Sequence, residues 1–470
     1  MGKLLRKTNP IKVQPELFEN DFFENLRQTE YANLEESGQI YLDFTGGNLY
    51  PKSIVEKHFN YLLSGVYGNP HSTNPSSRQS TIHVDEARKA VLDYFSAGDD
   101  YYCIFTSNAS AALQIVGECY PFSSESVFLL TADNHNSVNG IREYCKLKGG
   151  HYQYIQLNYE DLKINAQKLE EGLNGFEKET NKLFAFPGQS NVSGIKHPLE
   201  LIEKAHKKGW DVLLDAAAFV PTSKLDLTQY KPDYVSVSFY KIFGYPTGLG
   251  CLLLKKDKFA KLKKPWFAGG TVTWVSVNYE SYFLTENHER FENGTVNYLE
   301  IPAIKNGLEF IQKIGIEKIS DRIKSLNAYL IHQFENLKHS NGETLFNFFG
   351  TKNHDEKGGT FIFNVKGADG KQFPFELVEQ KANERLISVR TGCFCNPGID
   401  EVNSCVTTDE LAEFYTSRDH GSYHDWVTFV GKIRGAIRLS VGIATTQSDL
   451  DTFFGFVTET FKDKNTQDLI

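Results

Sequence analysis

The sequence predicts an α/β fold in which a large, mostly parallel sheet lies between helices and a smaller α+β unit follows. Three observations predict it. Short apolar runs alternate with helical patterns from about residue 41 to residue 300. These runs are continuously apolar, as in strands that are buried on both faces of a parallel sheet. A long helical stretch at about 301–337 then leads to a second group of strands, which predicts the smaller unit.

Each predicted strand is a short run of apolar residues bounded by polar residues or glycine. A final helix is predicted to begin near Ser448, a residue type suited to capping. We therefore predict a partly helical arm at 1–40, a large domain at 41–300 and a small domain at 301–470. In chain order, examples in the large domain are YYCIFT (101–106), SVFLLTA (126–132), KLFAFPG (182–188), DVLLDAAA (211–218), DYVSVSF (233–239) and GCLLLK (250–255), and the small domain contains TFIFNV (360–365), LISVRT (386–391) and AIRLSVGI (436–443).

The composition is that of an ordinary globular protein and argues against several classes of partner. The 470 residues carry a net charge of −9, which disfavours nucleic acid and anionic membrane. No apolar run approaches the roughly 18 residues that a membrane-spanning helix needs. The basic N-terminal stretch lacks the apolar run of a secretory signal, and the seven cysteines are scattered. We therefore expect a cytoplasmic protein with free thiols.

A lysine among apolar residues is the first candidate functional residue. Lys241 lies in SVSFYKIFGYPTGLG, and Asp215 interrupts the end of the preceding predicted strand. A buried ammonium is costly unless it is paired or neutralised, and a covalent bond to a cofactor aldehyde is one solution. Adjacent parallel strands would bring both residues to the carboxyl edge of the sheet, where such folds bind ligands. Two alternatives fit the same spacing. In one, the Lys241 side chain extends to solvent, and in the other, Asp215 and Lys241 form an ion pair with a structural role only.

Other polar residues follow or lie in predicted strands. The stretch SNASAALQIVGE opens a helix whose N-terminus suits a phosphate group, although an ordinary capped helix has the same pattern. His135 suits stacking on a cofactor ring or proton transfer, and the alternative is a solvated loop histidine. Asn191, in FPGQSNVSG, fits a ligand contact or a turn. Arg438, in IRLSVG, suits bidentate binding of a carboxylate or an exposed position on a strand.

The stretch RTGCFCNPG contains a candidate nucleophile. Cys393 and Cys395 follow a predicted strand and enter a loop punctuated by Gly and Pro. A thiolate on such a loop is reactive where a cation such as Arg390 stabilises it. The C-x-C pair lacks the usual zinc spacing, so no metal is expected. The alternative is a zinc site built from these two cysteines with Cys405, His420 and His424.

Together these motifs resemble class V enzymes of fold type I that use pyridoxal 5′-phosphate (PLP). The resemblance rests on SVSFYKIFGYPTGLG, LLDAAAFVPT, YLDFTGGNLYP, GNPHSTNPSS and RTGCFCNPG, and it covers about residues 41–461. Within that superfamily the sequence is most similar to the cysteine-desulfurase domain of molybdenum cofactor sulfurases. The resemblance implies a large PLP-binding domain with a sheet of the seven-stranded type, and a homodimer with shared sites.

The resemblance also implies a role for each candidate residue. Lys241 holds PLP as an imine and serves as the base, and Cys395 takes sulfur from L-cysteine as a persulfide. Asp215 pairs with the ring nitrogen. The remaining implied contacts are His135 stacked on the ring, Asn191 near the ring hydroxyl, Ala109, Ser110, Ser238 and Tyr240 at the phosphate, Gly294 and Thr295 at the phosphate of the neighbouring subunit, and Arg438 and Arg390 at the substrate carboxylate.

The implied activity is conversion of L-cysteine to L-alanine, with the sulfur on Cys395 passed to an acceptor. A PLP-dependent aminotransferase or lyase acting on another amino acid would share Lys241 and Asp215, because one fold hosts several chemistries. A non-enzymatic sulfur carrier is a third hypothesis. Ala218 and Tyr240 depart from many desulfurases, as in the molybdenum cofactor sulfurase branch. The chain ends at Ile470, before the second domain of full-length sulfurases, so the acceptor, a protein or a cofactor, stays open.

Overall fold

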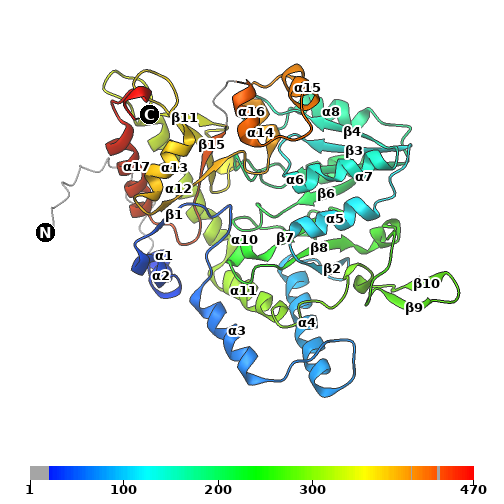
Figure 1. Cartoon of the computed structure of the whole chain (residues 1–470). Helices are drawn as coiled ribbons and strands as arrows, with labels where there is room; N and C mark the ends of the chain where they lie inside the picture. The colour runs from blue at the N-terminus through cyan, green and yellow to red at the C-terminus, as the bar shows by residue number, and fades with distance from the viewer. Residues whose placement is uncertain (1–20, 404, 431–434, 470) are drawn as a thin grey trace.

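The computed structural model describes residues 21–403, 405–430 and 435–469. These residues form two main β-sheets with helices packed around them (Figure 1). One sheet has seven strands and the other has four. In the described ranges, no helix has both the length and the apolar character needed to cross a membrane.

The seven-stranded sheet forms the larger part of the fold. Across the sheet the strands are β2 (Tyr101–Thr106), β8 (Gly250–Lys255), β7 (Tyr234–Ser238), β6 (Asp211–Asp215), β5 (Asn181–Pro187), β3 (Ser126–Thr131) and β4 (His151–Ile155). Only β8 runs antiparallel to its neighbours, β2 and β7. The other neighbours are parallel. The predicted α/β fold with a large, mostly parallel sheet is therefore confirmed.

Both faces of this sheet are buried, which explains the continuous apolar strand sequences. Phe184 and Phe186 belong to one hydrophobic core, whereas Leu183 and Ala185 belong to a second core on the opposite face. Side chains alternate between faces along a strand, so a strand covered on both sides must be apolar throughout. The helices from the start of the chain through this sheet are α1 (Asp21–Glu30), α2 (Ala32–Ser37), α3 (Lys52–Ser64), α4 (Pro75–Tyr94), α5 (Ala109–Cys119), α6 (Asn136–Asn139), α7 (Ile141–Leu147), α8 (Ala166–Asn174), α9 (Leu201–His206) and α10 (Phe239–Phe243).

The four-stranded sheet is antiparallel throughout. Its order is β11 (Phe346–Phe349), β12 (Thr360–Val365), β15 (Ala436–Ser440) and β14 (Arg390–Gly392). A segment from the start of the chain packs beside it. β1 (Ile40–Tyr41) pairs in parallel with β13 (Ile387–Ser388), and Asp43 forms a bridge with Ser440. Residues far apart in the sequence are therefore neighbours at this sheet.

The helices α12 (Ile316–Asn336), α13 (Phe375–Asn383) and α17 (Gln447–Phe461) pack in this second part, whereas α11 (Ile301–Ile314) packs mainly against α3 and α4. The long helical stretch predicted at 301–337 is two helices, because Gly315 lies between them with φ of 92°. Such a left-handed backbone interrupts a helix and favours glycine. The last helix begins one residue before the predicted Ser448, and Thr446 caps it in a reciprocal pair with Asp449.

Besides the short strand β1 and the edge strands β4 and β11, two further features were not predicted from the sequence. A hairpin of β9 (Val272–Ser276) and β10 (Ser281–Leu284) projects from the molecule (Figure 1). Three short helices, α14 (Pro397–Asn403), α15 (Thr408–Thr416) and α16 (Tyr423–Val430), follow the loop that carries Cys395. Both features lie on the periphery, where the apolar periodicity that marks core elements is weak.

Candidate active site

A cavity of about 170 Å³ opens at the carboxyl ends of β5, β6 and β7. Its lining also includes Asn108, Ser137 and Gln189, which the sequence did not single out. Several parallel strands end at this edge, so the loops that follow them meet here. The cavity brings together eight predicted site residues: Ala109, Ser110, His135, Asn191, Asp215, Ser238, Tyr240 and Lys241.

Lys241 is reached from this cavity, although the surrounding protein buries its amine. It lies in α10, which begins directly after β7. Burial lowers the pKa of Lys241, and the charge of Asp215 opposes that shift. Within the described residues no hydrogen bond or ion pair engages the amine. The Lys241 side chain therefore does not extend to bulk solvent. It presents to the cavity an amine that loses its charge more easily than that of an exposed lysine.

The glycine-rich turn after Lys241 is explained by packing. Gly244 has φ of 79°, and a Cβ there would collide with the backbone at Leu49. The Tyr240 carbonyl meanwhile accepts a hydrogen bond from Asn48 N at 3.3 Å. A side chain at position 244 would push this segment away. The turn therefore holds the helix of Lys241 against the chain at 47–50.

Asp215 lies at the end of β6 and is held by neighbouring donors. Its Oδ1 accepts hydrogen bonds from Ser236 Oγ at 2.9 Å and from Ala217 N at 3.1 Å. No described group engages Oδ2. These contacts fix the carboxylate while leaving one oxygen able to accept a further hydrogen bond. The charge of Asp215 also opposes the pKa shifts of both Lys241 and His135.

The N-terminus of α5 forms one end of the cavity. Asn108 caps the helix, and its Oδ1 accepts from Ala111 N at 3.0 Å. Ala109 N donates to Ser238 Oγ at 2.8 Å. The hydroxyls of Ser110 and Ser137 are 2.6 Å apart. This end therefore combines the N-terminus of an 11-residue helix with several hydroxyl groups. Such a set of hydrogen-bond donors suits an anion.

His135 is held as a neutral side chain over the same cavity. Ser137 N donates to its Nδ1 at 3.1 Å, so the ring proton lies on Nε2 in the neutral form. Burial lowers the pKa of His135, with a smaller opposing effect from Asp215. A neutral imidazole can lie flat against an aromatic ligand without adding a charge.

The loop of Cys395 is bonded to the edge of the seven-stranded sheet. Asn136 N donates to the Cys395 carbonyl at 2.8 Å. Asn191 Nδ2 donates to the Phe394 carbonyl at 2.9 Å. Asn396 Nδ2 donates to Asn191 Oδ1 at 3.0 Å and to the Asp133 carbonyl at 2.7 Å. Both ends of the Asn191 amide therefore bond this loop.

The backbone of this loop is strained. Phe394 and Cys395 have φ of 56° and 54°, a region that costs about 1 kcal/mol or more for residues other than glycine. Cys395 is exposed, and its charge is felt by the amine of Lys241. The hydrogen bonds described above thus hold an unfavourable conformation and keep the Cys395 loop at the sheet edge where Lys241 lies.

Five predicted site residues are not part of the lining of this cavity, and Cys395, described above, is one of them. Arg390 and Arg438 are bonded to Asp43 instead, at 2.7 and 2.8 Å. Thr295 lines a separate cavity of about 460 Å³ with Thr106 and Ser107, and Gly294 lines another of about 300 Å³. Asp43 was not singled out as a functional residue from the sequence.

The structure also bears on the alternative of a zinc site built from cysteines and histidines near Cys395. All seven cysteines are free. No cluster of three or more His, Cys, Asp or Glu side chains that could hold a metal occurs among the residues described. The side chain of His424 is outside that description. Burial raises the pKa of Cys393, which makes its thiol less nucleophilic at neutral pH.

Comparison with known sequences identifies related proteins. The family model described as aminotransferase class-V matches residues 40–453. A molybdenum cofactor sulfurase of Solanum lycopersicum is 37% identical over 93% of this chain and 57% of its own length. The Arabidopsis thaliana protein of the same name is 34% identical over 93% and 58%. The chain thus spans less than two thirds of these curated relatives.

Comparison with solved structures identifies the same fold. The apo cysteine desulfurase of Thermococcus onnurineus NA1 matches with a TM-score of 0.76 and 24% identity, over 93% of this chain and 98% of that one. The cystine C-S lyase C-DES, solved with its product cysteine persulfide, matches with a TM-score of 0.70 and 17% identity, over 92% and 100%. At these identities the likeness concerns the fold.

Proposed function

Because the chain belongs to the aminotransferase class-V family, we propose that it is a PLP-dependent cysteine desulfurase of the molybdenum cofactor sulfurase type. It converts L-cysteine to L-alanine and leaves the sulfur on Cys395 for an acceptor. The observation that carries this proposal is that Lys241 and Asp215 line one cavity and that the Cys395 loop is bonded to the same sheet edge. The names of its relatives and of the proteins that share its fold support the same chemistry.

The residues around the cavity fit PLP. Lys241 offers an unpaired amine of lowered pKa, as a covalent bond to an aldehyde requires. The open Oδ2 of Asp215 suits a protonated ring nitrogen, and the ring of His135 suits stacking. The α5 terminus, with Ser110, Ser238 and Tyr240 nearby, suits the phosphate. When bound, PLP would supply the electron sink for chemistry at the substrate α-carbon.

In this proposal Lys241 and Cys395 carry out different steps of the reaction. Lys241, released as a free amine, takes the α-proton from the substrate. The Cys395 thiolate attacks the substrate sulfur, and an S–S bond forms as the C–S bond breaks. The bonding electrons stay with the carbon fragment, which takes up a proton at Cβ, regains the α-proton from Lys241 and leaves as alanine. Arg438 and Arg390 hold the substrate carboxylate. Asn191 and Asn396 hold the loop so that the thiol stays near Lys241.

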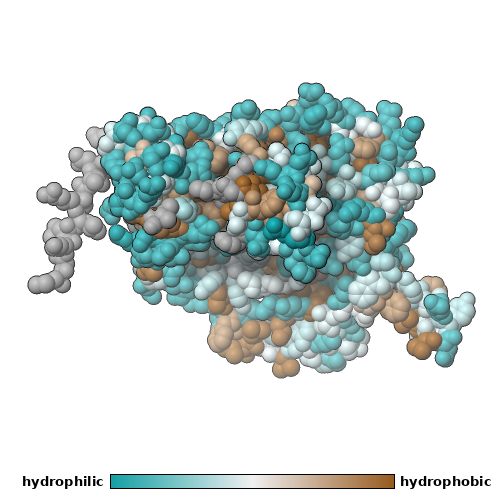
Figure 2. Space-filling model, turned by 45° about the horizontal axis from the view of Figure 1, so that its top comes forward, coloured by the Kyte–Doolittle hydropathy of each residue, from teal (hydrophilic) through white to brown (hydrophobic). Residues whose placement is uncertain are grey.

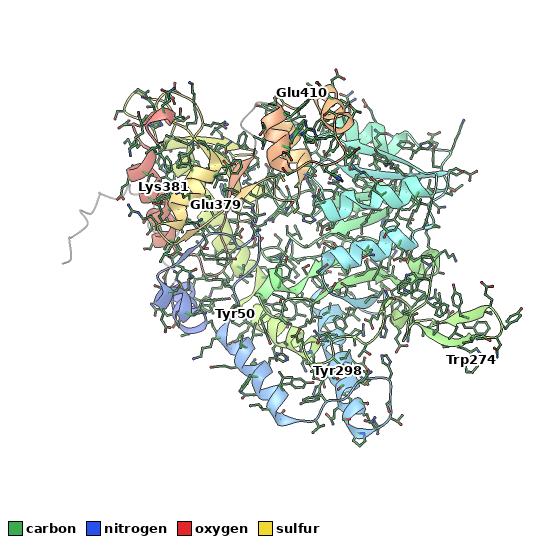
Figure 3. All side chains as sticks on the ribbon, in the orientation of Figure 1. Tyr50, Trp274, Tyr298, Glu379, Lys381 and Glu410 are labelled. Atoms are coloured by element: carbon green, nitrogen blue, oxygen red, sulfur yellow. The ribbon has the colours of Figure 1, made fainter. Side chains whose placement is uncertain are left out.

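The protein acts as a homodimer in this proposal. Gly294 and Thr295 do not line the Lys241 cavity of their own chain, which fits a role at the phosphate of a second copy. The β9–β10 hairpin carries large exposed apolar side chains, among them Trp274 at 69%, Tyr279 at 75% and Val277 at 99%. Figure 3 shows Trp274 on this projecting hairpin. Free exposed surface of this kind marks an association site.

A cytoplasmic location completes the proposal. The seven free cysteines fit a reducing compartment, and an exposed catalytic thiol needs one to stay reduced. Fractionation followed by detection of the chain would test this location. Recovery from an oxidising compartment would contradict it.

The activity is tested by measuring alanine released from L-cysteine by the PLP-loaded protein with a reductant present. We expect alanine from the wild type and from Cys405→Ala, which removes another exposed thiol. Cys395→Ala should lose the activity by at least about a hundredfold. Alanine release by Cys395→Ala at the wild-type rate would refute the role of that thiol. A protein that binds PLP and makes a keto acid from another amino acid would instead be an aminotransferase.

A further inference from the structure

Two arginines lie directly opposite each other on neighbouring strands of the four-stranded sheet. Arg390 of β14 pairs in register with Arg438 of β15. Like charges at opposed positions on neighbouring strands repel each other. The Arg438 side chain is almost fully buried, with 4% exposed, whereas that of Arg390 is 52% exposed. A buried guanidinium facing a second one needs a counter-charge.

Asp43 supplies that counter-charge to both arginines. Its Oδ1 accepts from Arg438 Nη2 at 2.8 Å. Its Oδ2 accepts from Arg390 Nη2 at 2.7 Å and from Arg390 Nε at 3.0 Å. The second amino group of Arg438, Nη1, donates to the Asn191 carbonyl at 3.1 Å. One carboxylate thus bridges two cations beside the residues that fix the Cys395 loop.

The backbone around Asp43 is built to hold the carboxylate in this place. Ser440 N donates to the Leu42 carbonyl at 2.8 Å, and Thr45 N donates to Ser440 Oγ at 2.9 Å. Gly46 N then donates to the Asp43 carbonyl at 3.0 Å. A Cβ at Gly46 would lie 2.6 Å from Arg390 Nη2 and 2.8 Å from Asp43 Oδ1. Glycine is therefore required for the chain to wrap this closely around the ion pairs.

The cluster retains one accessible donor and one net charge for a ligand. Within the described residues no contact engages Arg390 Nη1, whose side chain is half exposed, whereas Arg438 Nε is buried without a hydrogen-bond partner. Two guanidinium cations and one carboxylate leave a single net positive charge. The charges of both arginines are felt by the amine of Lys241, so the cluster lies within electrostatic reach of the reacting centre.

We propose that Asp43 is a specificity-determining residue that limits the substrate to amino acids with one carboxylate. This inference rests on the proposed function and adds a selection rule to it. A monocarboxylate substrate neutralises the single net charge of the cluster. The second carboxylate of a dicarboxylic amino acid meets Asp43 with no unpaired cation to offset it. Replacing the carboxylate by an amide removes that repulsion and frees a cation.

The test measures binding to the PLP-loaded protein, followed by the change in its visible absorption, for L-alanine and L-aspartate. The wild type should favour L-alanine. Asp43→Asn should shift the ratio of the two dissociation constants toward L-aspartate on the order of tenfold, as expected for one unit charge a few ångströms away in a partly exposed site. An unchanged ratio in a folded Asp43→Asn protein would overturn the proposal.

Two further variants separate selectivity from damage to the fold. Asp211→Asn is the matched control, because Asp211 is a buried carboxylate bonded by Lys258 and Lys261 at the opposite, amino-terminal end of β6. It should leave the ratio unchanged. Arg390→Gln keeps Asp43 and makes the cluster neutral. L-Aspartate should therefore bind even more weakly, relative to L-alanine, than it does to the wild type. Should Asp43→Asn fail to fold, an unchanged ratio in Arg390→Gln would also overturn the proposal.

The outcome is distinguishable from failure of the proposed activity. Alanine and aspartate binding requires no attack by Cys395, so a shifted ratio in a protein that releases no alanine from cysteine would support Asp43 and refute the desulfurase. Alanine release with an unchanged ratio would support the desulfurase and refute the role of Asp43. The double variant Asp43→Asn with Arg390→Gln restores one net charge and should restore the preference for L-alanine.

Discussion

Lys241 is tolerated in the interior because its amine is easily neutralised and faces a cavity. Burial lowers its pKa, so the neutral form that reacts with an aldehyde is populated at lower pH than for an exposed lysine. The same effect makes the freed amine a better proton acceptor near neutrality. The energetic cost of burying the residue and its chemical use therefore have one physical origin.

The role of Lys241 predicts the behaviour of Lys241→Ala. After addition of PLP and reduction with borohydride, the wild type should retain cofactor on the peptide that contains Lys241, and the variant should not. Its rate of alanine release should fall by about a thousandfold, within the range for loss of a general base. Lys196→Ala is the control, since burial also lowers the pKa of Lys196, to about 8. Retention of reduced PLP by Lys241→Ala would place the covalent bond elsewhere.

Lys357 is a second buried lysine, and it predicts a pH dependence of stability. Its Nζ donates to the Ser193 carbonyl and lies 4.8 Å from the centre of the Phe361 ring. Burial lowers its pKa from 10.5 to about 7. Between these values the unfolded chain binds a proton that the folded chain does not. The free energy of unfolding therefore rises with pH across this window, and the cost is fully present below pH 7.

Lys357→Met should remove this contribution. We expect the variant to be more stable than wild type at pH 7. The rise of its unfolding free energy between pH 7 and 9 should be smaller by about 1.4 kcal/mol per pH unit. Urea denaturation at several pH values measures both effects. Lys352→Met, at an exposed position, should behave as wild type, and an equal slope in Lys357→Met would contradict the argument.

The loop of Cys395 shows how an element can be fixed by side chains rather than by strand pairing. Asn396 is fully buried, and its amide joins the loop to Asn191 and to the Asp133 carbonyl. Asn396→Ala should destabilise the protein by about 1–3 kcal/mol, because buried partners lose their hydrogen bonds. The rate at which a bulky maleimide labels Cys395 should rise as the loop detaches.

Asn341→Ala provides the comparison for that experiment, since this exposed asparagine donates to the Ala368 carbonyl far from the site. It should change neither stability nor labelling appreciably. An Asn396→Ala protein with wild-type labelling and reduced stability would assign Asn396 to the core and not to the loop. Slower labelling would contradict the argument outright.

Elements were predictable from the sequence where burial determines them. The bounds of β2, β8 and β12 coincide with the predicted runs, because both strand faces are covered there. The β9–β10 hairpin was missed, since its exposed apolar residues follow no core periodicity.

The site was predictable where residues follow strand ends. Asp43 was not identified, because its partners Arg390 and Arg438 lie 347 and 395 residues away and no local pattern records that pairing.

The surface of the whole molecule predicts its association. Figure 2 shows hydrophobic residues on the projecting hairpin and along the lower edge of the molecule. Exposed residues of α3 include Phe59 and Leu63, at 60% and 71%. We expect a homodimer by light scattering. Replacing Trp274 and Phe283 by Ser should weaken the dimer and release PLP, because in the proposed homodimer each site loses the Gly294–Thr295 segment of its neighbour.

The control for that experiment is Tyr415→Ser, which removes an equally exposed aromatic side chain on α15. It should leave mass and PLP content unchanged. A hairpin variant that stays dimeric and retains PLP would place the interface on another face. A monomeric wild type with full activity would contradict shared sites.

The bridge from Asp43 to Arg438 also has a consequence for synthesis on the ribosome. The residues of the seven-stranded sheet are complete once β8 has emerged, near residue 255. Arg438 is made 183 residues after Lys255, a delay of about 10–40 s at typical elongation rates. A nascent chain can therefore form the cavity around Lys241 while the proposed subsite for the substrate carboxylate is still unformed. The two parts of the proposed site therefore form in a fixed temporal order.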